Sequence, residues 1–242
     1  MQGLFVRARG APAGSLAIMM SLPFMLAAPI SSRSPAQLLA RALAASRAQS
    51  SVRWSSHGSF DGETETLTTN AGTKEGSQVV SLVKGRSHGE VSAKLIADTV
   101  YVNGDIFALR NYMGFTATAA TDEANRWLSI PHSNPDFSAV AAGLTIGSTT
   151  TELEMTRPIA SLGESIVLGQ KVVGLKGKAR SPAGKPQLTM VVYVRARAVQ
   201  LPVEAKLTYQ GVTDAISLGH WNERVAETTP SDAISLQTSW LR

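Results

Sequence analysis

The chain has 242 residues, of which 43% are hydrophobic, and this is enough for a single domain with a substantial core. The formal net charge is +5, but no cluster of Lys and Arg alternates with aromatic residues, so nucleic acid is not expected as a partner. Cysteine is absent, which excludes disulfides, thiolate metal sites and cysteine nucleophiles.

Residues 1–32 have the pattern of a secretory leader. The first 14 residues carry two arginines and no acid, and an apolar stretch follows at residues 15–28. This stretch is short for a bilayer span, and Pro23 interrupts it. We expect a signal peptide cut after Ala28 or Ser32, and therefore an exported protein of the cell envelope, periplasmic or extracellular. An uncleaved N-terminal anchor and a buried helix are the alternatives.

A helix is expected next, from Ser34 to about Ala48, because Ser34 suits the N-cap and Pro35 the first helical position. Strands of alternating polarity follow, bounded by glycines and turn residues. They are expected at residues 52–60, 63–69, 78–84, 90–96 and 98–102. Asn103-Gly104, after the last of these, is the strongest turn signal in the chain.

The middle of the chain differs in composition. Residues 106–115 place aromatic and apolar side chains at helical spacing, and residues 126–130 read as a strand that Pro131 stops. Residues 137–155 predict one helix or two. The remainder returns to strands, at residues 165–168, 170–176, 187–194, 203–209 and 216–221. Pro182 and Pro186 flank an expected loop between two of these strands, and Pro202 marks a strand start or a bulge.

No internal repeat or low-complexity linker divides the chain. We therefore predict one α+β domain over residues 35–230, mainly antiparallel β, after a leader at residues 1–32. A flexible tail is expected at residues 231–242, because the chain after Pro230 has no strong pattern.

The sequence offers no catalytic or metal-binding motif. None of the four histidines is spaced from another histidine or an acid as a zinc helix requires; they are His57, His88, His132 and His220. Residues 163–167 lack the closing glycine of a nucleophile elbow, and residues 174–178 lack the spacing of a phosphate loop. We expect no metal, no cofactor and no enzyme. A site assembled only in the folded protein is the alternative.

The aromatic stretch indicates a different kind of site. A curved antiparallel sheet covered by helices on its concave face can enclose a cavity lined by aromatic and aliphatic side chains. The alternative is that these residues fill an ordinary core, as Met and aromatic side chains often do. The candidates for lining a cavity are Phe107, Tyr112, Met113, Phe115, Trp127 and Leu144.

The order of elements and several short motifs resemble the secreted LppX/LprAFG lipoproteins, which share the fold of the LolA lipoprotein carriers. The motifs are Val100-Tyr101-Val102-Asn103-Gly104-Asp105, Arg126-Trp127-Leu128-Ser129-Ile130-Pro131, Val172-Val173-Gly174-Leu175, Leu201-Pro202-Val203, Ile216-Ser217-Leu218 and Trp221-Asn222-Glu223. The resemblance covers roughly residues 35–230. It departs from the lipoprotein pattern in one respect, because this chain has no cysteine after its leader to carry a lipid.

The resemblance implies a LolA-like half-barrel of about eleven antiparallel strands, with helices on its concave side and a hydrophobic cavity for acyl chains. It also implies a function: binding a lipid, lipoglycan or acyl-chain ligand and carrying it across an aqueous compartment. The expected partners are this ligand and a membrane surface contacted peripherally, by a monomeric protein. The alternative is a non-catalytic sensor or interaction protein of the cell envelope with the same fold.

Overall fold

The computed structural model describes residues 33–60, 62–180, 188–197, 199–209 and 212–236. The predicted leader, the predicted loop between Pro182 and Pro186, and residues 237–242 of the predicted tail lie outside the described residues. The described part forms one sheet of twelve strands with five helices.

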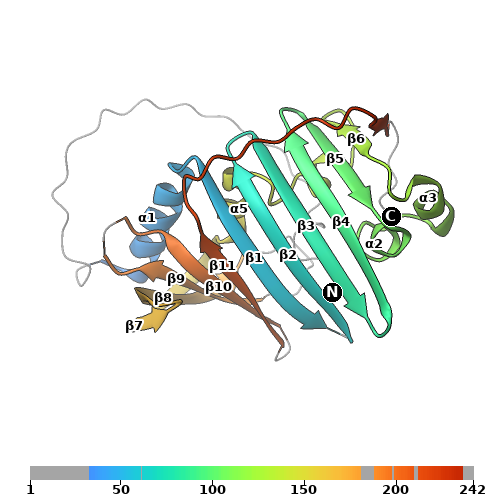
Figure 1. Cartoon of the computed structure of the whole chain (residues 1–242). Helices are drawn as coiled ribbons and strands as arrows, with labels where there is room; N and C mark the ends of the chain where they lie inside the picture. The colour runs from blue at the N-terminus through green and yellow to red at the C-terminus, as the bar shows by residue number, and fades with distance from the viewer. Residues whose placement is uncertain (1–32, 61, 181–187, 198, 210–211, 237–242) are drawn as a thin grey trace.

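The strands are β1 (Ser51–Phe60), β2 (Glu63–Gly72), β3 (Glu75–Lys84), β4 (Ser87–Ile96), β5 (Thr99–Gly104), β6 (Leu128–Pro131), β7 (Met155–Val167), β8 (Gln170–Ala179), β9 (Thr189–Arg195), β10 (Pro202–Tyr209), β11 (Val212–Gly219) and β12 (Ile234–Ser235). The helices are α1 (Pro35–Arg47), α2 (Ile106–Asn111), α3 (Ala117–Glu123), α4 (Phe137–Val140) and α5 (Ile146–Glu152). Across the sheet the order is β12-β6-β5-β4-β3-β2-β1-β11-β10-β9-β8-β7 (Figure 1). Only the β12–β6 pair is parallel among the described strands, so the predicted mainly antiparallel fold class is confirmed.

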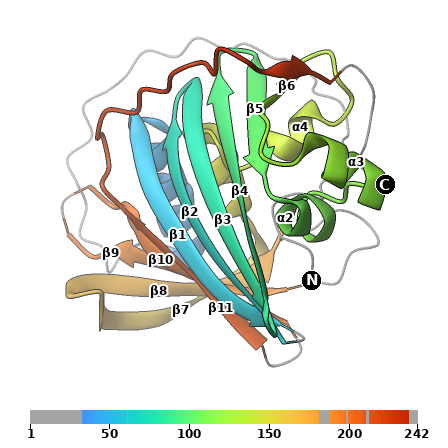
Figure 2. The same ribbon diagram turned by 45° about the vertical axis from the view of Figure 1, so that its right-hand side comes forward.

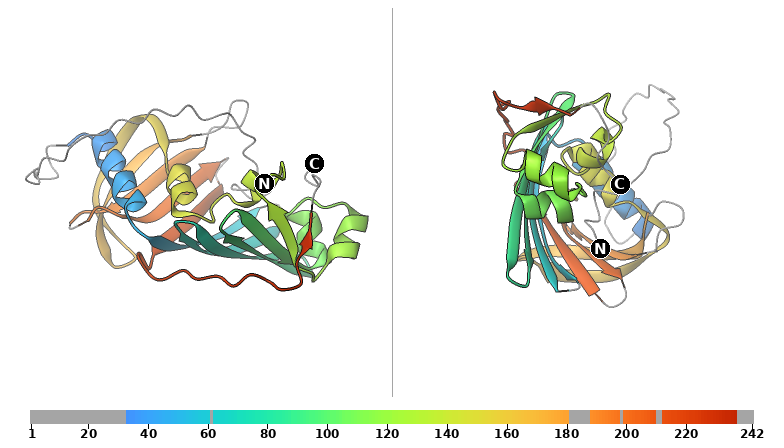
Figure 3. Two further views of the ribbon diagram at one scale, coloured as in Figure 1. Left: turned by 90° about the horizontal axis from the view of Figure 1, so that it is seen from above. Right: turned by 90° about the vertical axis from the view of Figure 1, so that its right-hand side faces the viewer.

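The sheet is open and strongly bent, so that β7 and β8 run at a steep angle to β3 and β4 (Figure 2). The helices lie on the concave face, and the chain after β11 crosses the opposite face (Figure 3). Helix α1 packs on β7, β10 and α5, while α2 packs on β4. The predicted half-barrel with helices on its concave side is therefore confirmed, with twelve described strands instead of about eleven.

Alternation along the strands decides which side chains face the helices. In β1, Val52 and Trp54 are each 1% exposed, whereas Arg53 between them is exposed. Trp54 lies opposite Thr69 of β2, which is fully buried, and the same parity continues to Leu67. The concave side of the sheet is thus the apolar one, as period-two alternation requires.

Helix α1 begins and packs as its sequence predicts. The Ser34 hydroxyl accepts a hydrogen bond from the Gln37 amide at 3.3 Å, and the Gln37 side chain accepts one from the Ser34 amide at 3.0 Å, which completes a capping box. One face of the helix is buried, comprising Leu38, Leu39, Ala42, Leu43 and Ser46. Each of its leucines stabilises the fold by about 1.5–3 kcal/mol through burial. Its apolar residues Leu38, Leu39, Ala42 and Leu43 belong to the core that the sheet and the helices share.

The turn predicted at Asn103-Gly104 is wrong. Both residues belong to β5, where Gly104 pairs with Val91. A Cβ at Gly104 would lie 3.2 Å from side-chain atoms of both Val91 and Leu109. The glycine therefore makes room for α2 on the sheet, and the actual turn falls between β4 and β5, where Ala97 has a φ of 53°.

The helical segments differ from prediction in their lengths. The predicted helix at residues 106–115 ends at Asn111, and α3, which the sequence did not predict, follows with Thr116 as its N-cap. The segment 137–155 forms two short helices, one of the two predicted alternatives. Strand β7 starts at Met155 instead of residue 165. The prediction missed its first half because those residues are mostly exposed and show little apolar alternation.

The C-terminal segment, residues 220–236, lies on the convex face. Lys94 pairs with Glu227 at 3.4 Å, and the Glu227 amide donates to a Glu75 carboxylate at 3.3 Å. Its end forms β12, where the Ile234 amide donates to the Trp127 carbonyl at 2.8 Å. This part of the expected loose tail is therefore held by the sheet.

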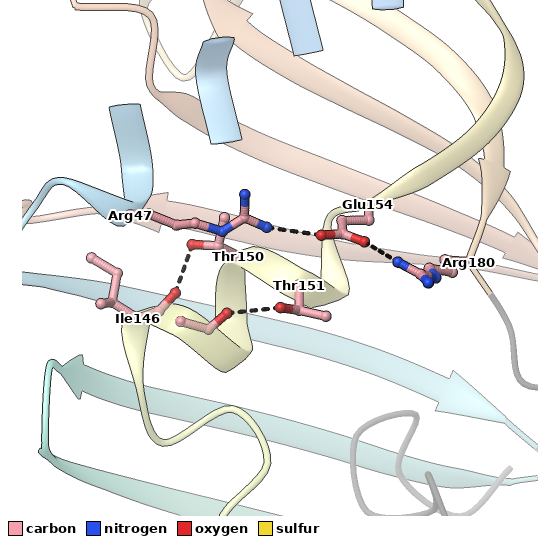
Figure 4. Close-up of polar contacts among 7 residues, drawn as sticks. Arg47, Ile146, Thr150, Thr151, Glu154 and Arg180 are labelled. Carbon is pink, nitrogen blue, oxygen red and sulfur yellow. Dashed lines mark hydrogen bonds and ion pairs between the residues drawn. The ribbon is translucent and has the colours of Figure 1, made fainter. Parts of the chain in front are cut away.

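A polar junction joins α1 to the far half of the sheet (Figure 4). The Glu154 carboxylate accepts from Arg47 at 2.8 Å and from Arg180 at 2.7 Å. Both arginine side chains are largely exposed, so each ion pair contributes little stability.

Candidate ligand-binding site

An open pocket of about 580 Å³ lies on the concave side, where the sheet ends against α4 and α5. Its lining comes from the β2–β3 turn, the β4–β5 turn, the end of β6 and the α4–α5 segment. These residues, which we call the edge pocket, are Thr73, Lys74, Leu95, Ala97, Asp98, His132, Phe137, Ser138, Ala141, Ala142, Thr145 and Ser148. Its volume falls within the range of roughly 300–1,000 Å³ that is common for small-ligand sites.

The edge pocket has an apolar side and a polar rim. Leu95, Phe137 and Ala141 supply apolar surface, and the Phe137 ring lies 4.8 Å from the His132 ring. Lys74 and Asp98 are exposed in the two turns at the mouth. A ligand with an apolar tail and a polar head group could place each part against matching surface.

Close backbone packing fixes the wall that α4 and α5 form. Gly143 has a φ of 81°, and its carbonyl accepts from Trp54 Nε1 at 3.4 Å and from the Thr149 hydroxyl at 3.1 Å. A Cβ at Gly76 of β3 would collide with the Leu144 carbonyl. Glycine at position 76 therefore lets this segment lie directly on the sheet, and the pocket wall is anchored to the core.

Two carboxyl groups lie on the concave face at the other end of the strands. Glu65 of β2 is paired in register with Gly58 of β1, and a Cβ at Gly58 would lie 3.4 Å from Asp214 Oδ1 of β11. Burial and the neighbouring charge of Asp214 raise the pKa of Glu65 to about 7. Burial also raises the pKa of Asp214, whose Oδ1 has no hydrogen-bond partner in the part of the chain that the structure describes. These acids can accept hydrogen bonds from a polar group inside the half-barrel.

Two more polar groups, on or next to the helices, also have raised pKa values. The Tyr112 hydroxyl has no hydrogen-bond partner among the described residues, and burial together with the Glu65 charge raises its pKa. Burial raises the pKa of Glu152, the last residue of α5, to about 7. The concave side therefore combines an apolar surface with a few acids whose pKa is raised by burial.

The six predicted lining residues fall into three places. Tyr112, Met113 and Phe115 are at most 6% exposed and, with the partly buried Phe107, pack into the core around α2. Leu144 is fully buried beside the edge pocket without lining it. Trp127 lies apart, because Lys94 of the convex face sits 5.5 Å from its ring centroid.

The residues that line the edge pocket were not predicted as site residues. Its turns and its α4–α5 wall are far apart in the sequence, and only the sheet register brings them together. The position of Glu65 could have been predicted from the sequence. It lies two residues from Leu67, so the alternation of a strand places both side chains on one face of the sheet.

A smaller pocket of about 170 Å³ lies between β1 and the C-terminal segment. Its walls are mostly polar, with His220 Nδ1 2.7 Å from a Glu223 carboxylate oxygen and Arg53 3.6 Å from Glu223. This pocket is too small and too polar for an acyl chain.

Within the described ranges, no group of His, Cys, Asp and Glu side chains has the arrangement of a metal site. None of the helices in the described part of the chain is long and apolar enough to cross a bilayer.

No family model matches the sequence, and no curated protein matches it. Among solved structures, LprF from Mycobacterium bovis is similar with a TM-score of 0.52 at 13% identity, over 82% of this chain and 97% of LprF. The lipoprotein LppX from Mycobacterium tuberculosis gives a TM-score of 0.49 at 16% identity, over 80% of this chain and 99% of LppX. The similarity to LprF shows a shared fold and confirms the resemblance at that level.

Proposed function

We propose that this protein binds the acyl chain of a lipid and carries it between membranes across an aqueous compartment of the cell envelope. The edge pocket is the observation that carries the proposal, because it offers enough volume and an apolar wall with a polar rim. The fold shared with LprF and the leader-like sequence of residues 1–32 support it.

Hydrophobic burial can supply the affinity without any catalytic group. Ten methylene groups moved from water into the pocket contribute about 8 kcal/mol, which corresponds to a micromolar dissociation constant before the entropy cost of association. A ligand held in this way can also be released, as a carrier requires. We propose that the protein acts as a monomer that touches the membrane peripherally.

The polar rim suggests the head group. Lys74 and Asp98 are exposed in separate turns at the mouth, and His132 lies beside Phe137. A carboxylate or phosphate held at the mouth would gain a charge-assisted hydrogen bond from Lys74. The proposed ligand is therefore a fatty acid or an anionic lipid.

The test uses protein lacking residues 1–32, purified without detergent and examined by native mass spectrometry. The expected result is a lipid adduct, and displacement of a fluorescent fatty acid by unlabelled fatty acid. Ala141→Trp, which fills the edge pocket, should lose both signals while the exposed control Ala44→Trp on α1 keeps them. Protein that stays empty and takes up no fatty acid would contradict the proposal.

A further inference from the structure

Two neighbouring loops stand out at one corner of the sheet. The β7–β8 turn, residues 167–170, and the β9–β10 loop, residues 196–201, are joined by hydrogen bonds. The Ala196 amide donates to the Lys171 carbonyl at 2.9 Å, and Arg195 Nε donates to Gln170 Oε1 at 2.9 Å. The strand ends that carry the two loops therefore lie side by side.

This surface exposes large apolar side chains. Ile166 is 68% exposed, Leu168 is 59% exposed and Val199 is 54% exposed. They are among the most exposed large hydrophobic residues that the structure describes. Grouped apolar exposure of this kind marks a contact surface.

Leu168 also occupies an unfavourable backbone conformation. Its φ is 47° and that of Gly169 is 73°, so both central residues of the turn are left-handed. Such a turn favours Asn-Gly, because a side chain as large as leucine is strained at positive φ. A strained and exposed leucine at a hairpin tip points to a role outside the fold.

The charge of this corner is positive. Residues 164–171 and 195–201 contain three Lys and Arg and one Glu, a net charge of +2. Lys171 and Arg197 are exposed next to the apolar tips. Glu164, the one acid, is already paired with Lys171 at 2.6 Å.

We propose that Ile166, Leu168, Lys171, Arg197 and Val199, the docking corner, form the surface by which this protein binds an anionic lipid bilayer. Apolar tips can enter the head-group boundary while surrounding cations contact anionic lipids, and neither interaction suffices alone. The sheet register places these loops at the same end of the strands as the two turns that line the edge pocket. The inference deepens the proposed function, because a carrier must exchange its ligand with a membrane.

The test is flotation of protein from residue 33 onward with phosphatidylcholine vesicles, with and without about 30 mol% phosphatidylglycerol. The wild type should bind only the anionic vesicles, and salt should weaken binding as it screens the charges. The double variant Ile166→Ser with Leu168→Ser should bind about tenfold more weakly. Val79→Ser with Val83→Ser, which removes exposed apolar groups from the convex face of β3, should bind as the wild type does.

Leu168→Asn separates docking from folding. Asparagine tolerates positive φ, so its melting temperature should equal or exceed that of the wild type while vesicle binding falls. If this variant and the double serine variant both bind anionic vesicles as strongly as the wild type does, the proposal is overturned. The proposal would also be overturned if the wild type were a dimer that binds no vesicles and these variants were monomers. The surface would then bind a second copy of the chain.

Fatty-acid titration without vesicles distinguishes this inference from the proposed function. The docking variants should keep wild-type fatty-acid affinity. A wild type that floats with anionic vesicles but takes up no fatty acid would support the docking corner and reject the proposed ligand. A wild type that takes up fatty acid but never floats would support the proposed ligand and reject the docking corner.

Discussion

The two edges of the sheet differ in how far their strands are buried and covered. At one edge β6 is four residues long, Leu128 and Ile130 are fully buried, and the short β12 covers it. At the other edge β7 is thirteen residues long, and most of its residues are exposed. Unpaired strand edges invite association with other chains, so proteins cover or interrupt them. The first edge serves the core, and the second leaves surface for a contact.

The exposed edge is interrupted in ways that disfavour pairing with another strand. The β7–β8 register shifts twice, between Thr156 and Ala160 and between Ser161 and Gly163, and Pro158 lies within the strand. Irregularities and proline at an edge discourage strand addition. This favours contact through the hairpin tip over contact along the strand.

The largest expected effect contrasts a buried residue at one edge with an exposed one at the other. Leu128→Ala should lower the free energy of unfolding by about 2–5 kcal/mol, because it leaves a cavity in the core. Ile166→Ala should change it by about 0.5 kcal/mol or less. Urea denaturation of both variants measures the difference, and equal losses would contradict the division between the edges.

The wall of the edge pocket gives the next effect. Gly76→Ala should lower stability by about 1–3 kcal/mol, because the added methyl group collides with the Leu144 carbonyl. Gly219→Ala, whose added Cβ would meet no atom within 4 Å, is the matched control and should be nearly neutral. If thermal unfolding shows both variants unchanged, α4 and α5 are not packed on the sheet as described.

The acids of the concave side predict a pH dependence. Because the pKa of Glu65 is raised to about 7, the folded protein binds its proton more tightly than the unfolded chain does. Stability should therefore fall as pH rises from about 4.5 to about 7, by an amount on the order of 1 kcal/mol for this group. Glu65→Gln should remove part of that slope in denaturant titrations and stabilise the protein at pH 8. A slope that is unchanged in the variant would show that Glu65 is solvated.

The smallest effect is expected at the exposed junction of Figure 4. Glu154→Gln should lower stability by about 1 kcal/mol or less, because both arginine partners remain largely exposed. Adding Arg180→Gln in that background should change little more. A loss as large as that of Leu128→Ala would mean that the junction is far better shielded from solvent.

The sequence predicted regular elements well where local chemistry defines them. The capping box and Pro35 locate α1, and alternation locates most strands. The turn prediction at Asn103-Gly104 was wrong because Gly104 allows close packing within a strand, as Gly76 does. Strand β7 was shortened in the prediction because an exposed edge strand lacks an apolar face.

The candidate site was harder to predict than the fold. The aromatic residues around α2 turned out to pack in the core, and the edge pocket depends on turns that meet only once the register is known. Parity also bears on Trp127, because its neighbour Leu128 faces the concave side and adjacent residues point to opposite faces.

The location of a bound acyl chain tests the account most directly. A fatty acid with a photoreactive group at its tail is crosslinked to the protein, and the labelled peptides are mapped by mass spectrometry. Saturable labelling is expected at Leu95 and at residues 137–142, and Ala141→Trp should abolish it. Labelling that is scattered over the surface, or that Ala141→Trp leaves intact, would contradict it.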